Sequence, residues 1–518
     1  MQDQAFLGLE AALAVPDPGA GGVELHVATQ WLHEDRGQIA ACLGLPEDKV
    51  RLVLGGVGGA FGAREDISLQ VHTCLLALRL GRPVRIAYSR GESFLGHVHR
   101  HPASIWMRHH ARADGEIVKI ESRMVFDGGA YASTSSAVLI NAVTHAQGPY
   151  RCPNAVVDGY AVRTNHLPCG AMRGFGVVQA CFAHESQMDR LALACDLDPA
   201  EIRRRNAMRT GDRLITGQPV LNVAPVERCI RETSALALPD EPVGGHPLAD
   251  GTPDVMKLPG AAGRTAGPGD IVRGIGWGVA MKNLMYSEGF DDYSTARCRL
   301  VDGVVTLKVA TAEVGQGFVT IAAQIARTIL GVDEVVLDRI DTGVGSAGST
   351  SASRQTWMSG GAVDLACRTV REKMFDHIGR THGVDPLRLA VEGTDVVDTV
   401  SGWRMSVGDA TAGASFDETV EYRHPATTEL DENGQGNCHT AFAFVAHRAV
   451  VDVDPELGLV KVVQIATAQD VGRALNPLSV LGQIEGGIAQ GLGLAVMEEI
   501  IQIDGVIRNG NFTDYLLS

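Results

Sequence analysis

The segment 55–66, GGVGGAFGARED, begins where an apolar, strand-like run at residues 50–54 ends, and a helix-like stretch follows it. Four further segments repeat this arrangement, namely 170–176 (GAMRGFG), 313–317 (EVGQG), 348–356 (GSTSASRQT) and 476–487 (NPLSVLGQIEGG). Glycine lets another group approach the main chain closely, and the free N–H groups at a helix N-terminus bind anions. Five such loops predict a backbone that wraps around one large, polar, partly anionic ligand.

Composition sets the broad class. A chain of 518 residues predicts two or more domains with ample core. The net charge of −16, without a block of Lys and Arg, gives no support for nucleic-acid binding. No apolar run approaches the roughly 20 residues of a membrane span, and the N-terminus lacks the features of a signal peptide. Ten cysteines without a close pair argue against iron–sulfur, zinc-ribbon or disulfide frameworks within the chain. We expect a large, soluble, cytoplasmic protein.

The strand-like and helix-like segments predict an α+β fold with two lobes. The first lobe covers residues 1–232, a linker or surface excursion covers 233–270, and the second lobe covers 271–518. Apolar periodicity predicts strands at 23–28, 50–54 and 117–126, and helices at 66–80, 177–194, 318–330, 361–378 and 477–500. Because strand, glycine loop and helix recur in both lobes, we expect a pseudo-duplicated architecture of mixed sheets and helices. Both ends lack polar fraying, which predicts truncation at each end.

Several shorter motifs suggest other chemistries, and each has a plainer interpretation. GVGSAG at 343–348 matches a dinucleotide fingerprint, but polar residues follow where an apolar helix start is needed. His184 begins an HExxH pattern, yet Met188 occupies the second histidine position, which excludes that zinc motif. HVHRH at 97–101 could chelate a metal, although polar residues at a domain surface or cofactor edge explain it more simply. EGFDD at 288–292 is more typical of a solvated turn than of a metal cage.

Taken together and in order, the five loops resemble those of the molybdenum-cofactor-binding subunit of the xanthine dehydrogenase/aldehyde oxidase family. The resemblance covers essentially the whole chain and is strongest to the bacterial form in which this subunit is a separate polypeptide. It implies a molybdopterin, with either a phosphate or a tail such as cytosine dinucleotide. The family holds its metal through the cofactor, so a chain without clusters of Cys and His fits it. The resemblance also implies a 2Fe-2S subunit and an FAD subunit as partners in a hetero-oligomer.

In the first lobe, the resemblance assigns residues to the cofactor and to the substrate. Those expected beside the cofactor and its metal are Gln30, Gly59, Phe61, Gly62 and Arg173, with Gln30 bonding a metal oxo ligand and Arg173 contributing its main chain. Ala60 and Ala63 stand where animal enzymes have glycine.

Glu65 and Phe175 are expected to contact the substrate, with Phe175 stacking on a planar ring. The plainer alternative for Glu65 is an acidic residue in the first turn of a helix, favoured by the helix dipole. The plainer alternative for Phe175 is a core phenylalanine.

In the second lobe, the resemblance places a turn over the cofactor and a small-residue loop around the metal and pterin. The residues concerned are Gly315, Gln316, Gly317, Ala352 and, as a further pterin contact, Gln483. Helix capping by small polar residues explains each of them alone, but not their joint occurrence in this order.

Two departures bear on activity. Asn141 stands where purine-oxidising animal enzymes have an arginine, and a neutral amide cannot stabilise negative charge on a purine as guanidinium does. The family's general base is a glutamate in a GVGEPP-like segment, and no GVGE occurs up to Ser518, so we expect no catalytic residue within this chain. The resemblance implies water-derived hydroxylation of a purine such as xanthine, with electrons passing to iron–sulfur centres and FAD. Hydroxylation of another N-heterocycle or an aldehyde, or a cofactor-binding fragment without turnover, stay open.

Overall fold

The computed structural model describes residues 1–19, 21–240, 259 and 271–517 of the chain. The predicted excursion at 233–270 therefore lies largely outside the described residues. Within them, mixed parallel and antiparallel sheets carry helices on their faces, which confirms the predicted α+β class.

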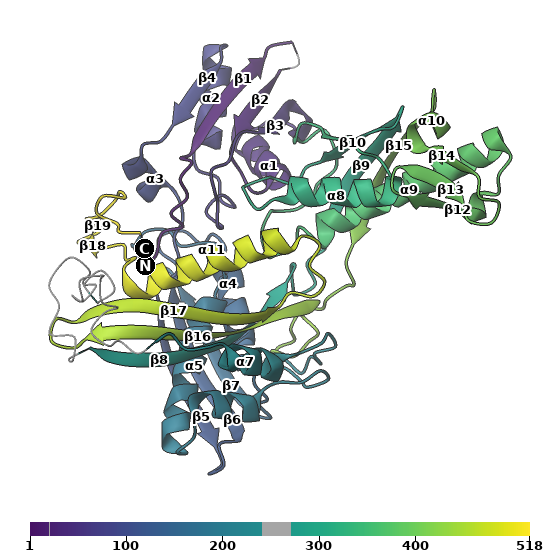
Figure 1. Ribbon diagram of the computed structural model, residues 1–518. Helices are drawn as coiled ribbons and strands as arrows, with labels where there is room; N and C mark the ends of the chain where they lie inside the picture. The colour runs from purple at the N-terminus through teal and green to yellow at the C-terminus, as the bar shows by residue number, and fades with distance from the viewer. Residues whose placement is uncertain (20, 241–258, 260–270, 518) are drawn as a thin grey trace, which may run out of the picture.

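A four-stranded sheet near the N-terminus carries the first two long helices (Figure 1). Its order is β3-β2-β1-β4, with β2 and β3 parallel and β1 antiparallel to both of its neighbours. Helix α1 connects β2 to β3, and α2 connects β3 to β4. The strands are β1 (Ala11–Asp17), β2 (Gly22–Val27), β3 (Val50–Leu54) and β4 (Val84–Ala87), and the helices are α1 (Leu32–Leu43) and α2 (Gln70–Leu80). Apolar side chains of these six elements form one core, with Leu25, Ile39 and Leu52 fully enclosed.

The second half of the chain builds a sheet with the same order and the same strand directions. Its order is β11-β10-β9-β15, with β10 and β11 parallel and β9 antiparallel to both neighbours. The elements are β9 (Tyr293–Val301), β10 (Val304–Val309), α8 (Phe318–Leu330), β11 (Val335–Leu337), α9 (Met358–His382) and β15 (Ser415–Arg423). The two sheets meet edge to edge, because the Leu54 amide donates to Ile340 O (2.9 Å) and the Thr342 amide to Leu52 O (3.0 Å). This repeat confirms the predicted pseudo-duplication.

A small insertion between α9 and β15 forms a separate three-stranded sheet with the order β12-β13-β14. It comprises β12 (Leu389–Glu392), β13 (Asp395–Asp398), β14 (Arg404–Ser406) and α10 (Val407–Ala410). The apolar faces of α8 and α9 pack with β9, β10 and this insertion in one core.

Six further strands form two three-stranded sheets in the lower part of Figure 1. One contains β5 (Ala103–Ala111), β6 (Ile117–Asp127) and β7 (Ala155–Val162), and the other β8 (Val272–Leu284), β16 (Ala441–Asp454) and β17 (Leu459–Asp470). The helices among them are α4 (Ser135–Thr144), α5 (Val177–Ala194), α6 (Pro199–Asn206) and α7 (Val226–Ala235), whereas the short helix α3 (Arg90–Gly96) follows β4 and lies nearer the first sheet (Figure 1). One core draws Met188 and Ile230 together with Met281 and Phe444, so it crosses the predicted division of the chain.

Helix α11 (Pro477–Val496) crosses the middle of the molecule, between the first sheet and the β8–β16–β17 sheet (Figure 1). The predicted helix at 477–500 is confirmed as α11, whereas the prediction of a loop over residues 476–487 is wrong, because this segment is helix from Pro477 onward. The Asn476 side chain caps the helix by accepting from the Ser479 amide (3.0 Å), and Pro477 suits the first helical position. Of its residues only Gly493 is buried, so α11 belongs to no hydrophobic core of the described residues. A pair of short strands, β18 (Gln502–Ile503) and β19 (Val506–Ile507), follows it.

Several predicted boundaries match closely. The predicted strand 50–54 and helices 177–194 and 318–330 coincide with β3, α5 and α8, where apolar periodicity is uninterrupted. Helix α2 begins at Gln70 rather than at 66, because residues 61–69 form turns. In the part of the chain that the structure describes, no helix combines the length and the apolar character that a membrane crossing requires.

Candidate functional site

The Gln30 side chain joins two loops that are far apart in sequence. Its Nε2 donates to Thr350 O (2.8 Å), and its Oε1 accepts from the amides of Gly62 (3.1 Å) and Arg64 (3.2 Å). The Thr350 amide returns a hydrogen bond to Gln30 O (2.9 Å). Since an amide side chain carries two donor hydrogens, one hydrogen of Gln30 stays available for a ligand. The structure thus places Gln30 where the first loop meets the 348–356 loop.

Three of the predicted site residues other than glycine have left-handed backbone conformations. Phe61 has φ +54°, Phe175 has φ +47° and Ala352 has φ +50°. Residues with side chains seldom adopt this region, and it costs about 1–3 kcal/mol where it is held by the surroundings. Such strain gathers at ligand sites, so it supports a functional role for all three loops.

The first loop and the 170–176 loop lie in direct main-chain contact. The Arg173 amide donates to Phe61 O (2.8 Å), and Arg100 Nη2 donates to Arg173 O (3.0 Å). Gly62 has φ +110°, and a Cβ there would lie 2.5 Å from Ala171 O. Only glycine permits this approach. We call this main-chain contact between residues 61–62 and 171–173 the seam, and it fixes the main chain of both loops.

The Glu65 side chain contacts serines of the 348–356 loop. Ser349 Oγ donates to Glu65 Oε1 (3.0 Å), and the Tyr286 hydroxyl lies 3.3 Å from Ser351 Oγ. Burial raises the pKa of Glu65, although hydrogen bonds from Ser351 and Ser349 oppose the shift. The alternative explanation, an acidic residue in the first turn of a helix, fails because α2 begins only at Gln70. Glu65 is thus an enclosed carboxyl group beside the loop that contains Ala352.

Phe175 and Asn141 lie on neighbouring elements. Phe175 is half-buried and packs against the core cluster that contains Phe126 and Val138, so the core alternative holds for part of its surface. Asn141 lies on α4 and is buried, and its Oδ1 has no hydrogen-bond partner among the described residues. A buried carbonyl oxygen without a partner is costly, which makes Asn141 a candidate to meet a ligand.

Arg173 reaches α11 with its guanidinium group. Its Nη2 donates to Gln483 O (2.8 Å) and Oε1 (3.2 Å), and its Nη1 to Gln490 Oε1 (3.3 Å). A Cβ on Gly486 would find only this guanidinium within 4 Å, at 3.6 Å. No carboxylate of the described chain forms an ion pair with Arg173, and burial lowers its pKa. The structure thereby brings Gln483 into contact with the Arg173 guanidinium group, which is a cation without a carboxylate partner among the described residues.

The 313–317 loop is closed by its own side chains. Glu313 accepts from the amides of Gly315 (2.9 Å), Gly317 (3.1 Å) and Val319 (3.0 Å). Gln316 accepts from the Val314 amide (2.8 Å). The prediction of free N–H groups at this helix N-terminus is therefore wrong, because a carboxylate already occupies them. The loop could contact a ligand only through other atoms of its main chain.

The acidic run at 288–292 is not a fully solvated turn. Asp292 is buried and pairs with Arg354, which is also fully enclosed. Arg354 further donates to Ala347 O and to Ser349 O (3.0 Å). The Asp292–Arg354 ion pair thus supports the 348–356 loop through a hydrogen bond to its main chain. Nothing in the EGFDD sequence distinguishes Asp292 from its exposed neighbour Asp291.

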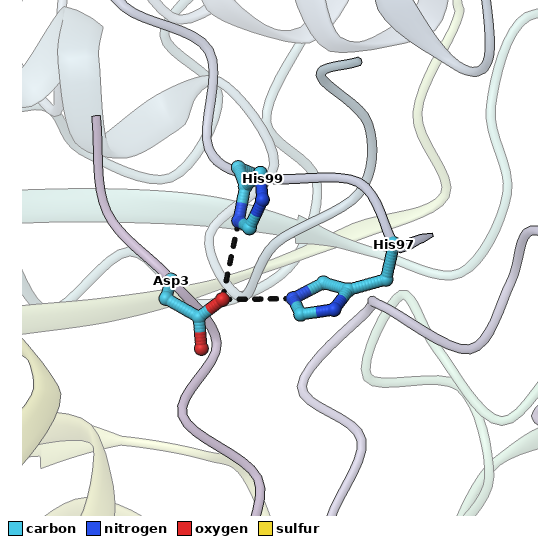
Figure 2. A group of neighbouring side chains, drawn as sticks. All are labelled: Asp3, His97 and His99. Atoms are coloured by element: carbon cyan, nitrogen blue, oxygen red, sulfur yellow. Dashed lines mark hydrogen bonds and ion pairs between the residues drawn. The ribbon is translucent and has the colours of Figure 1, made fainter. Parts of the chain in front are cut away.

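The histidines of HVHRH separate into two environments. His97 Nε2 lies 2.8 Å and His99 Nδ1 3.1 Å from the same oxygen of Asp3, and all three are buried (Figure 2). Burial alone raises the pKa of Asp3, but the two histidines hold it well below its usual range. His101 instead contacts Ser135 Oγ (2.8 Å). One carboxylate oxygen shared by two imidazoles is the geometry of a hydrogen-bonded cluster, which ties the N-terminal segment to residues 97–99.

Comparison with known families shows what this geometry belongs to. Residues 1–207 and 255–518 each match a family model described as a molybdopterin cofactor-binding domain. The chain is a member of the molybdopterin cofactor-binding family. The expectation drawn from the five loops is thus confirmed at the level of family and cofactor.

The chain is similar to named bacterial proteins. It is 30% identical to a probable xanthine dehydrogenase subunit of Bacillus subtilis over 521 residues, covering 100% of this chain and 66% of that protein. It is 42% identical to the nicotinate dehydrogenase large molybdopterin subunit of Eubacterium barkeri over 213 residues, covering 40% of this chain and 50% of that protein. The chain thus spans about half to two thirds of these relatives.

Solved structures share the fold. The quinoline 2-oxidoreductase of Pseudomonas putida 86 matches with a TM-score of 0.83 at 25% identity, covering 100% of this chain and 66% of that one. The residues at the candidate site fit a molybdopterin in two respects. Arg173 offers a cation without a carboxylate partner among the described residues, and the Gln30 side chain keeps one amide hydrogen for a ligand. Unpaired cations and free amide donors are the usual means of holding a polar, anionic cofactor.

Proposed function

We propose that this chain is the molybdopterin-binding part of a cytoplasmic hydroxylase that oxidises a purine such as xanthine. The observation that carries the proposal is the convergence at Gln30, whose amide joins the Phe61–Gly62 loop to the loop containing Ala352. The similarity to a probable xanthine dehydrogenase subunit supports the purine. A 2Fe-2S subunit and an FAD subunit, which the family resemblance implies, would complete a hetero-oligomer.

The residues have distinct tasks in this proposal. Gln30 and the main chain of Gly62 and Arg173 position the cofactor, and the Arg173 guanidinium faces its negative charge. When bound, a molybdopterin supplies the metal at which an electron-poor carbon takes up oxygen from water and releases two electrons. Glu65 holds or releases a proton toward a ring nitrogen, since its enclosed carboxyl has a raised pKa. Phe175 orients the ring by stacking.

A second candidate is hydroxylation of another N-heterocycle. Asn141 favours it, because no guanidinium stands at the position expected to anchor a purine. The nicotinate and quinoline activities in the names of two similar proteins agree with this class.

A turnover panel tests the proposal. The full-length protein is purified with its partner subunits, and oxidation of xanthine, hypoxanthine, nicotinate, quinoline and benzaldehyde is followed with a dye acceptor. We expect xanthine to give the highest kcat/KM and its product to contain oxygen from labelled water. Glu65→Gln should lower kcat/KM at least about tenfold, whereas Glu372→Gln on the exposed face of α9 should not. Higher kcat/KM for nicotinate or quinoline would favour the second candidate, and no turnover of any compound would contradict both.

A further inference from the structure

Lys282 is a largely enclosed cation without an anion. It lies on β8, and among the described residues its ammonium group hydrogen-bonds to the neighbouring Asn283, through the main-chain oxygen (3.1 Å) and the side-chain oxygen. No carboxylate of the described chain forms an ion pair with it. Burial lowers the pKa of Lys282 to about 7. A protein seldom keeps an enclosed ammonium in this state unless a ligand or partner supplies the counter-charge.

The main chain beside this cation contacts a group of buried polar residues, two of which have atoms without hydrogen-bond partners among the described residues. The Asn283 amide donates to His145 Nε2 (3.3 Å), and His145 Nδ1 donates to Asn141 O (2.8 Å). The ring of His439 lies 5.1 Å from that of His145. Asn141 Oδ1 and both ring nitrogens of His439 are buried and have no hydrogen-bond partner in the described chain. We name Asn141, His145, Lys282 and His439 the Lys282 cluster.

Lys282 is the only group of the cluster that holds a positive charge close to neutral pH, and with its pKa at about 7 it holds that charge below about pH 7. Burial lowers the pKa of His439 to about 3 and that of His145 well below its usual value. The neighbouring Lys282 contributes to both shifts, so both imidazoles are neutral near pH 7. The cluster can therefore offer one cation together with neutral hydrogen-bonding groups, which is the composition of a site for a singly charged anion.

The chain connects this cluster to the candidate site from two sides. Three residues after Lys282, the Met285 amide donates to Ala352 O (2.8 Å), and Tyr286 approaches Ser351. On the other side, Asn141 shares α4 with Val138, and a Cβ on Gly176 would lie 2.1 Å from Val138 O. The cluster thus adjoins both the loop containing Ala352 and the loop containing Phe175.

We infer that Lys282 is the anion-recognising residue of the substrate site, so that the substrate is a heteroaromatic compound carrying a negative charge. The charge is either a ring carboxylate or a deprotonated ring nitrogen, to which His439 would donate its ring N–H, while Asn141 Oδ1 would accept from an N–H of a ligand that has one. The inference rests on the proposed function and names its substrate class. Lys282 then supplies from β8 the cation that position 141 lacks. An ammonium acts here as a point charge, which suits a monoanion.

Paired substrates test the inference on the complete enzyme. Nicotinate is compared with nicotinamide, and xanthine with a methylated xanthine that cannot lose a ring proton. In Lys282→Met, kcat/KM for the charged member of a pair should fall about 10- to 100-fold, while that for the neutral member changes less than about threefold. Lys282→Arg should restore much of the loss. Lys119→Met removes a lysine that pairs with Glu121 on β6 and should change neither.

The two pairs also separate the two sources of charge. An effect on nicotinate alone identifies a carboxylate, and an effect on xanthine alone identifies an ionised ring. Equal losses for charged and neutral compounds, or no loss for either, would overturn the inference.

A binding measurement keeps this test independent of turnover. Equilibrium dialysis of nicotinate, nicotinamide and both xanthines is carried out on wild type and Lys282→Met, with molybdenum content measured in parallel. Weaker binding of an anion to the variant, at unchanged metal content, supports the inference even if nothing is turned over. Binding that ignores charge contradicts it, whereas an absence of molybdenum from the wild type contradicts the proposed function instead.

Discussion

Gln30 illustrates how a side chain expected to face a ligand is first held by the protein. Three of its hydrogen bonds go to Gly62, Arg64 and Thr350, and one amide hydrogen remains. The resemblance predicted that Gln30 matters, but a contact that spans 320 positions of sequence lies beyond any local pattern. The same holds for Glu65, whose partner Ser349 lies 284 positions away.

Asp35 allows a test of burial at the scale of one residue. It lies on α1 and is fully enclosed, with its Oδ2 3.4 Å from Gln70 Nε2 and no partner for Oδ1 among the described residues. Burial raises its pKa from 3.8 to about 7. A carboxyl group whose pKa is raised by folding binds its proton more tightly in the folded state. Its effect on stability is therefore most favourable below about pH 4 and is lost as the pH rises through about 7.

Asp35→Asn should therefore stabilise the protein at pH 8, on the order of 2 kcal/mol, and have little effect at pH 4.5. Chemical denaturation at both values measures the change in the free energy of unfolding. Glu34→Gln, one position earlier and exposed, is the matched control. Equal effects of Asp35→Asn at both pH values would contradict the assigned cause.

The role of a residue could be predicted from the sequence only where that role follows from the residue type and from its place in a motif. The strained backbone at Phe61, Phe175 and Ala352 falls on residues that the resemblance had already singled out. Asp292 was misjudged, because its burial depends on Arg354, which approaches from 62 positions away. Lys282 was missed altogether, since nothing in the sequence around it distinguishes an enclosed lysine from an exposed one.

At the scale of elements, the two equivalent sheets explain why the loops converge. Gln30 follows β2 and precedes α1, and Gln316 follows β10 and precedes α8, at equivalent points of the two sheets. The loop from β3 to α2 and the loop from β11 to α9 are likewise equivalent. Because the sheets meet edge to edge, the loops at their ends face a common centre. The theme of strand, glycine loop and helix was visible in sequence, and the pairing of the edges was not.

Gly62→Ala tests the seam between two of these loops. The new Cβ would lie 2.5 Å from Ala171 O at φ +110°, so we expect a loss of about 3 kcal/mol or more in the free energy of unfolding. Gly56→Ala is the control, because a Cβ there meets nothing within 4 Å in the same loop. Thermal unfolding of both variants, with bound molybdenum measured in each, checks the result. A stable Gly62→Ala protein with full metal content would show that the seam does not matter.

Helix α11 marks the limit of prediction for elements. The helix at 477–500 was predicted, but its first part was also counted among the glycine-rich loops because of Gly482, Gly486 and Gly487, and glycine weakens helices by about 1 kcal/mol each. The Asn476 cap and the polar contacts to Arg173 are consistent with its helical form. Glycine on this helix leaves room beside the Arg173 guanidinium, a reason that only the folded arrangement reveals.

At the scale of the whole molecule, the two halves of the sequence do not form two independent folding units. The core that joins Met188 to Phe444, and the contact of the Ile500 amide with Met1 O (2.8 Å), connect distant parts of the chain. Sequence patterns predicted the fold class and the repeat, because both follow from local periodicity. They could not predict this interleaving, which depends on contacts between segments hundreds of residues apart.

The molybdenum content of the full-length protein, isolated with its partner subunits from cells that make the cofactor, tests the central claim most directly. We predict about one molybdenum per chain, together with a pterin released on denaturation. A known molybdenum hydroxylase from the same cells confirms that cofactor is present. A folded protein that contains neither molybdenum nor pterin, beside a loaded control, would contradict the claim that these loops hold a molybdopterin.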